Sequence, residues 1–121
     1  MSFRKYTGSD KYHFRYYKKT VFHPFLVIIV VEVDKKKGKY LVSGFSLTSS
    51  EKAVNKKPGR YIKFNSNPSG DIEEKCYLCK TPIKNKKSYL FTRPLWNWHL
   101  SKEDEKKVDE LLAKMQKENN Q

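Results

Sequence analysis

The chain has 121 residues, 37% of them hydrophobic and 32% charged, a length that suits one domain with a single core. The 26 Lys and Arg residues outnumber the 13 Asp and Glu, which gives a formal charge of +13 and favours nucleic acid, an acidic protein or an anionic membrane face as partner. Two cysteines are too few for a disulfide scaffold, and the apolar run at 24–33 is too short to cross a bilayer. Residues 1–12 lack the apolar core of a secretory signal, so we expect a cytoplasmic protein with no membrane partner.

The N-terminal half predicts a lead-in followed by a long hairpin. Residues 1–19 form an aromatic and basic arm, in which KYHFRYYKK at 11–19 suits an amphipathic strand. The β-branched run from Pro24 to Val33 predicts a central strand buried on both faces. A turn at 34–39, with Gly38 at positive φ, leads into a second strand at 39–47.

The middle of the chain alternates between turn residues and short strands. Residues 48–59 and 65–71 are rich in turn residues and predict loops around a short strand at 60–64. Two further strands are predicted at 75–83 and 87–95, separated by a turn formed by KNKK at 84–87.

One amphipathic helix closes the chain. Ser101 suits the N-cap and Asp104 stands where a capping box places a carboxylate. An apolar stripe follows, formed by Val108, Leu111, Leu112 and Met115. The pattern predicts a mostly β (α+β) protein: a single small β-barrel domain over 20–117, with this helix packed on it and a tail at 118–121.

His23 and two hydroxyl residues form the first candidate site. Pro24 favours extended backbone at His23, which places the imidazole at a strand entrance, where its ordinary titration range suits proton transfer. The hairpin brings the end of the second strand, with Thr48 and Ser49, beside the start of the first, where hydroxyls and backbone N–H groups can hold a phosphate. The alternatives are a surface histidine and a hydrogen-bonded turn cap.

Basic and aromatic residues form a second candidate set, suited to phosphates and unpaired bases. The alternative is a solvated lysine-rich face. A zinc site is not predicted, because Cys76-x-x-Cys79 is a single pair without a second pair or a nearby histidine. The set comprises Arg15, Tyr16, Tyr17, Lys18, Lys19, Lys52, Lys56, Lys57 and Arg60.

Four segments between about residues 20 and 115 together resemble the MazF/PemK/Kid family of toxin endoribonucleases. His23-Pro24-Phe25-Leu26-Val27-Ile28 matches the Arg-Pro pair that opens a hydrophobic strand in that family, with His23 in place of the family's catalytic arginine. Ser46-Leu47-Thr48-Ser49 is similar to its Ile-Thr-Ser strand end. GDIEEKCYLCKTPI and the helix start LSKEDEKKV are similar in order and spacing to its C-terminal motifs. The family's Gly-rich opening is absent.

The resemblance implies an SH3-like barrel that cleaves single-stranded RNA at selected sequences, without metal or other cofactor, through the substrate's 2′-OH. It implies that His23 acts as general acid or base, that Thr48 and Ser49 hold the scissile phosphate, and that Arg15 or Arg60 offsets developing charge. It also implies an acidic antitoxin and a homodimer. The alternative reading is a non-catalytic module that binds nucleic acid, or a protein such as gyrase, on the same barrel.

Overall fold

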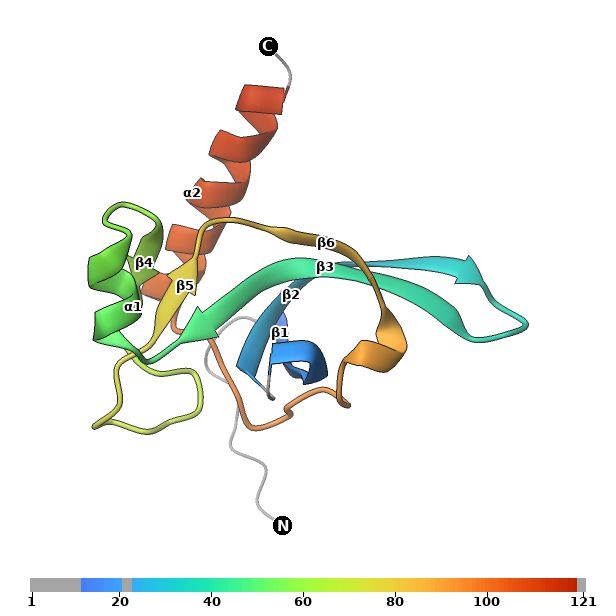
Figure 1. Ribbon diagram of the computed structural model, residues 1–121, viewed down its shortest axis with the longest axis horizontal. Coiled ribbons are helices and arrows are strands. Elements are labelled where there is room, and N and C mark those ends of the chain that lie inside the picture. Colours follow the sequence, from blue (N-terminus) through green and yellow to red (C-terminus); the bar gives the residue numbers. More distant parts are fainter. Residues whose placement is uncertain (1–11, 21–22, 120–121) are drawn as a thin grey trace.

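Antiparallel strands and a C-terminal helix make up the computed structural model, which describes residues 12–20 and 23–119 (Figure 1). The elements are β1 (His13–Tyr17), β2 (His23–Asp34), β3 (Lys39–Thr48), α1 (Glu51–Lys56), β4 (Tyr61–Lys63), β5 (Tyr77–Cys79), β6 (Ile83–Lys87) and α2 (Lys102–Asn119), with 3₁₀ turns η1 at Lys18–Thr20 and η2 at Ser88–Leu90. The sheet order is β1-β2-β3-β5-β4, and β6 pairs with β3 away from this path. The protein is therefore mostly β with a helix after the sheet, as predicted.

The predicted hairpin is confirmed and sets the position of the candidate site. Phe25 pairs with Ser46 and Val30 with Val42, and Gly38 closes the turn at φ 62°. The Asp34 carboxylate accepts hydrogen bonds from two backbone N–H groups of this turn. At the other end, His23 pairs with Tyr17 of β1 and Thr48 pairs with Tyr77 of β5. The start of β2 and the end of β3 therefore lie at the same end of the sheet.

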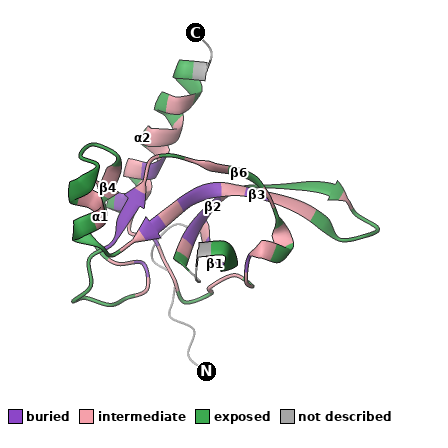
Figure 2. Ribbon diagram, in the orientation of Figure 1, coloured by how far each residue is buried: buried purple, intermediate pink, exposed green. Residues whose placement is uncertain are grey.

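The outer half of β2 departs from the prediction of a strand buried on both faces. β1 pairs with β2 only as far as Val27, and a register shift follows between Val27 and Ile29. Beyond that point Ile29, Val30, Val31 and Val33 are 45–59% exposed, and the hairpin extends past the body of the sheet (Figure 2). The prediction is wrong for this half because neighbouring elements cover β2 only along its first residues.

The core lies on both faces of the sheet, as strand alternation requires. On one face, Phe14, Leu26 and Phe45 belong to the larger cluster, which also contains the fully buried Val108 of α2. Phe25, on the other face, packs in a cluster with Tyr17, Val27, Val42 and Phe91. The remaining predicted stripe residues of α2 pack against the larger cluster and are partly buried, namely Leu111, Leu112 and Met115.

Two segments adopt a different secondary structure from the one predicted. Residues 48–59, expected to be a loop, contain α1, whose N-cap Ser50 accepts a hydrogen bond from the Ala53 N–H at 3.2 Å. The expected turn at 84–87 is part of β6, in which Asn85 has φ 56° and donates its N–H to Ser43 Oγ. Pairing with β3 overrides the turn preference of the KNKK sequence.

The segment predicted as the second C-terminal strand, residues 87–95, also differs from expectation. Residues 88–95 run through η2 and then along β1, held by hydrogen bonds from Thr92 N to Tyr16 O and from Leu95 N to Phe14 O. The strand predicted within residues 11–19 is confirmed, because β1 spans His13–Tyr17 and pairs with β2, whereas residues 1–11 of the predicted arm lie outside the described residues. Within residues 12–20 and 23–119, each helix is too short or too polar to cross a membrane.

Candidate functional site

His23, Thr48 and Ser49 line one cavity of about 450 Å³ at the end of the hairpin. His23 is the first residue of β2, Thr48 is the last residue of β3, and Ser49 follows directly. His23 and Ser49 are exposed and Thr48 is half-buried, with its Oγ1 accepting a hydrogen bond from the Ser50 N–H. The predicted proximity of the imidazole and the hydroxyls is confirmed. The described residues of the lining are Tyr16, His23, Pro24, Leu47, Thr48, Ser49, Asn67, Ser69, Glu74, Lys75, Cys76 and Trp98.

An aromatic pair forms one side of this cavity. Tyr16 and Trp98 meet edge to face, with ring centroids 5.9 Å apart, and Trp98 also lies 5.8 Å from the Phe14 ring. Trp98 packs against the larger core cluster, as expected of a packing residue, while it also reaches the cavity. The site therefore has an aromatic wall fixed by the core beside its hydroxyl and imidazole groups.

Glu74 and Lys75 bring charges to the cavity that sequence reasoning did not identify. Lys75 Nζ lies 2.7 Å from Glu51 Oε1, which connects α1 to the cavity wall. The hydrogen bond with Lys75 lowers the pKa of the Glu51 carboxyl, and the same bond raises the pKa of Lys75. The only sequence signal for these residues was the cluster of charges before β5, and their placement depends on the loop that precedes that strand.

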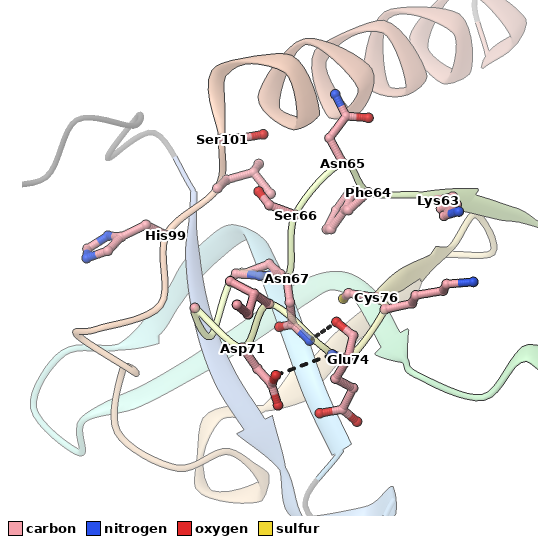
Figure 3. A pocket seen from close by; sticks show the side chains of 15 residues that line it. Lys63, Phe64, Asn65, Ser66, Asn67, Asp71, Glu74, Cys76, His99 and Ser101 are labelled. Atoms are coloured by element: carbon pink, nitrogen blue, oxygen red, sulfur yellow. Dashed lines mark hydrogen bonds between the residues drawn. The ribbon is translucent and has the colours of Figure 1, made fainter.

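That loop, residues 65–75, is held together by its own side chains (Figure 3). Asn67 Nδ2 donates to the Glu74 carbonyl at 3.0 Å, and Asn67 Oδ1 accepts from the Ser69 N–H and hydroxyl at 3.0 and 2.8 Å. Asp71 Oδ1 accepts from the backbone N–H groups of Glu73 and Glu74. Asx turns of this kind give the loop a fixed shape, so the cavity wall is preformed.

A second cavity, of about 540 Å³, lies against the same loop and shares four lining residues with the first. The shared residues are Asn67, Glu74, Lys75 and Cys76. The second cavity also includes His99, which is half-buried (Figure 3). The loop is thus the common wall of two adjoining hollows.

Asp104 anchors the other end of this loop to α2. Its side chain is fully buried and accepts hydrogen bonds from the backbone N–H groups of Asn65 and Ser66, at 2.7 and 3.2 Å. The predicted N-cap is confirmed, because Ser101 Oγ accepts from the Asp104 N–H at 3.1 Å. Sequence reasoning assigned the Asp104 carboxylate to the cap and missed its contact with the loop.

Arg15 does not lie at the His23 cavity. Its Nε donates to His13 Nε2 at 3.2 Å and its Nη1 donates to the Thr92 carbonyl at 3.1 Å. Burial lowers the pKa of Arg15; burial, with a smaller effect from the Arg15 charge, lowers the pKa of His13. The guanidinium is therefore fixed beside β1, where it lines a different hollow with Val30 and Tyr40.

The predicted RNA-binding residues divide into one core residue and a group of exposed cations. Tyr17 is only 4% exposed and stacks on Phe91 with ring centroids 4.7 Å apart, so its predicted role in base stacking is wrong. The cations are exposed, but they do not line the His23 cavity. They are Lys18 and Lys19 on η1, Lys52 and Lys56 on α1, and Lys57 and Arg60 in the following turn.

The two cysteines occupy different environments. Cys76 is buried in the larger core cluster, and burial, followed by the charges of Asp104 and Glu74, raises the pKa of its thiol to about 12. Cys79 is half-buried at the end of β5. Among the residues that the structure describes, no three His, Cys, Asp or Glu side chains gather in a group that could hold a metal ion.

Comparisons with known proteins give no match: none of the family models, curated proteins or solved structures searched resembles this chain closely enough to be assigned.

Proposed function

We propose that the protein is a metal-independent endoribonuclease that cleaves single-stranded RNA, built on an SH3-like barrel and acting as the toxin of a toxin–antitoxin pair. The observation that carries this proposal is the meeting of His23 with Thr48 and Ser49 at one cavity. These residues lie far apart in the sequence and supply the groups that phosphodiester cleavage needs: a proton acceptor and hydrogen-bond donors for phosphate. The formal charge of +13 supports a polyanionic substrate.

In the proposed reaction the substrate's 2′-oxygen attacks the adjacent phosphorus. His23 accepts the 2′-OH proton, the bond from phosphorus to the 5′-oxygen breaks, and that oxygen takes a proton from solvent. The products are a 2′,3′-cyclic phosphate and a 5′-OH end. Thr48 and Ser49 hydroxyls hold the non-bridging oxygens, and Lys75 offsets the charge that develops on them. Lys75 therefore offsets the developing charge, the role that the family resemblance implies for Arg15 or Arg60.

The test is incubation of purified protein with unstructured RNA in the presence of EDTA, with mapping of the product ends. Wild type is expected to produce cyclic-phosphate ends. His23→Ala removes the proton acceptor and is expected to reduce the cleavage rate by about 10²- to 10⁴-fold. Ser49→Ala is expected to reduce it less, and Lys114→Ala, on the exposed face of α2, is the matched control that retains the wild-type rate. Intact RNA with wild type, or equal rates with wild type and His23→Ala, would contradict the proposal.

The position of Arg15 favours a second candidate, a module on the same barrel that binds nucleic acid without cleaving it. Lys75 is the sole Lys or Arg among the described residues that line the His23 cavity, and a lysine offers less charge stabilisation there than an arginine-based site does. Retained RNA binding with no product, unchanged by His23→Ala, would establish this alternative.

An acidic antitoxin and a homodimer complete the proposal. A strongly basic surface matches an acidic protein that blocks the RNA site, because complementary potentials accelerate and orient association. Analytical ultracentrifugation of the purified chain measures the oligomeric state directly, and competition between RNA and an acidic partner tests whether the two share a surface.

A further inference from the structure

We propose that the outer part of the β2–β3 hairpin carries a second binding surface for single-stranded RNA, away from the His23 cavity. This surface, here called the arm surface, consists of Tyr40 and Tyr89 with Arg15, Lys37, Lys39 and Lys87 around them. It extends the proposed function, because it names where the same RNA strand is held outside the cleavage site.

Two adjoining hollows form the arm surface. One, of about 440 Å³, is lined by Arg15, Val30, Tyr40, Val42, Ser88 and Tyr89. The other, of about 490 Å³, is lined by Val33, Lys37, Gly38, Lys39, Tyr40, Leu41, Lys87, Ser88 and Tyr89. Because Tyr40, Ser88 and Tyr89 belong to both, the hollows are continuous, and the two tyrosines lie where they meet.

Strand pairing explains how these residues come together. Val30 pairs with Val42 across β2 and β3, and Leu41 pairs with Lys87 across β3 and β6. Tyr89 follows on η2 and lines the second hollow together with the hairpin residues Lys39 and Tyr40. The Tyr89 side chain is 67% exposed, and Lys87 Nζ lies 6.0 Å from its ring centroid. An exposed aromatic residue thus lies beside a lysine, directly after β6 and next to the hairpin.

The charges at the arm surface favour an anion. Arg15, Lys37, Lys39 and Lys87 line the two hollows, and within the described chain neither hollow is lined by a carboxylate. Glu32 pairs with Tyr40 across the strands but lines neither of them. A second copy of the chain would bring like charges together here, whereas an RNA strand supplies the opposite charge. The His23 cavity and the cavity that adjoins it, by contrast, are both lined by Glu74.

The exposed tyrosine distinguishes RNA from an acidic peptide as the occupant. Unpaired bases stack on aromatic faces while lysines neutralise the neighbouring phosphates, and this combination is typical of proteins that hold single strands. The exposed Val30 and Val33 add apolar surface beside the ring, 45% and 59% exposed respectively. Aromatic, apolar and cationic groups are therefore combined on one surface.

The test measures binding of a short fluorescent 2′-O-methyl oligoribonucleotide, which lacks the nucleophile for cleavage, by fluorescence anisotropy. Tyr89→Ala is expected to weaken binding roughly 5- to 100-fold, as loss of one stacking platform does, and Tyr89→Phe is expected to restore it. Trp96→Ala is the matched control: Trp96 is 79% exposed but lines neither hollow. Circular dichroism confirms that each variant is folded.

The salt dependence of the same binding isolates the lysines. Lys37→Ala and Lys87→Ala are each expected to make the slope of log K against log salt shallower by about 0.7, the value for one phosphate of a single strand. Unchanged affinity and slope in all arm variants, or an equal loss with Trp96→Ala, would overturn the inference. The inference would also be overturned if Tyr89→Ala changed only the oligomeric state, or if the surface bound polyglutamate but not the oligoribonucleotide.

This inference and the proposed cleavage fail separately. His23→Ala is expected to retain binding of the 2′-O-methyl strand within about twofold while it loses cleavage. Binding that depends on Tyr89 in a protein that never cuts RNA would leave the arm surface standing and reject the nuclease. RNA cleavage in a protein whose RNA binding does not depend on Tyr89 or the lysines would support the nuclease and reject the arm surface.

Discussion

The carboxylate of Asp104 links the start of α2 to the loop that forms the cavity wall. It is fully buried, and its charge is balanced by two backbone N–H donors and by Lys107 Nζ at 3.5 Å. Lys107 also donates to the Asn65 side chain and to the Lys63 carbonyl. A buried carboxylate is tolerated when it is paired and hydrogen-bonded in this way. Asp104 therefore positions the loop while contacting neither cavity.

Replacement of Asp104 tests this positioning role. Asp104→Ala leaves the Asn65 and Ser66 N–H groups without their acceptor, and we expect it to lower the free energy of unfolding by about 2–4 kcal/mol. Glu103→Ala, on the same turn but exposed, is the control and is expected to cost less than about 1 kcal/mol. Urea denaturation followed by circular dichroism measures both. Equal stabilities of the two variants would show that the buried contacts contribute nothing.

At the scale of elements, the β2–β3 hairpin brings the imidazole and the hydroxyls together, and Gly44 is a position where its two strands approach closely. Gly44 pairs with Val27 on one side and with Ile83 on the other. A Cβ at this position would lie 2.0 Å from the Leu26 carbonyl oxygen and 2.7 Å from Phe25 Cε1. The absence of a side chain is thus required for β2 to approach β3.

Gly44→Ala is accordingly expected to destabilise the protein by at least about 3 kcal/mol, because backbone must move to relieve the overlap. Gly59→Ala is the control: its φ is 81° and no atom lies within 4 Å of the added Cβ, so only the backbone penalty of about 1–2 kcal/mol applies. Thermal unfolding distinguishes them. A Gly44→Ala protein as stable as Gly59→Ala would contradict the close approach of the two strands.

Elements determined by local sequence could be predicted, and those determined by distant contacts could not. The hairpin followed from a β-branched run and a glycine turn, and the α2 stripe followed from its period. β6 (Ile83–Lys87) forms because β3 supplies a partner, so the turn-like composition of residues 84–87 was misleading. The same distinction between local sequence and distant contacts applies to the site. The position of His23 beside Thr48 followed from the predicted hairpin. Glu74 and Lys75 could not be predicted, because they reach the cavity through a loop whose shape depends on Asn67 and on Asp104 of α2.

At the scale of the whole molecule, the positive charge is distributed over more than one surface. The exposed cations of η1 and α1 line neither hollow of the arm surface, and Lys75 provides a further charge at the His23 cavity. Such a distribution attracts a polyanion from many directions, and phosphate contacts then fix its position without selecting a sequence. In the proposed function, the overall charge therefore supplies affinity for RNA, and the cavity between the hydroxyls and the aromatic wall supplies the chemistry.

The most direct test of a phosphate at His23 is a nuclear magnetic resonance titration of the three histidines in the chain. The probe is a dinucleotide with a 2′-deoxy first sugar, which places a phosphodiester in the site but cannot be cleaved. The account predicts that the imidazole signals of His23 shift saturably, more than those of His13 or His99, and that Ser49→Ala weakens this binding. Saturable shifts of His13 or His99 with His23 unchanged would place the phosphate elsewhere and contradict the account.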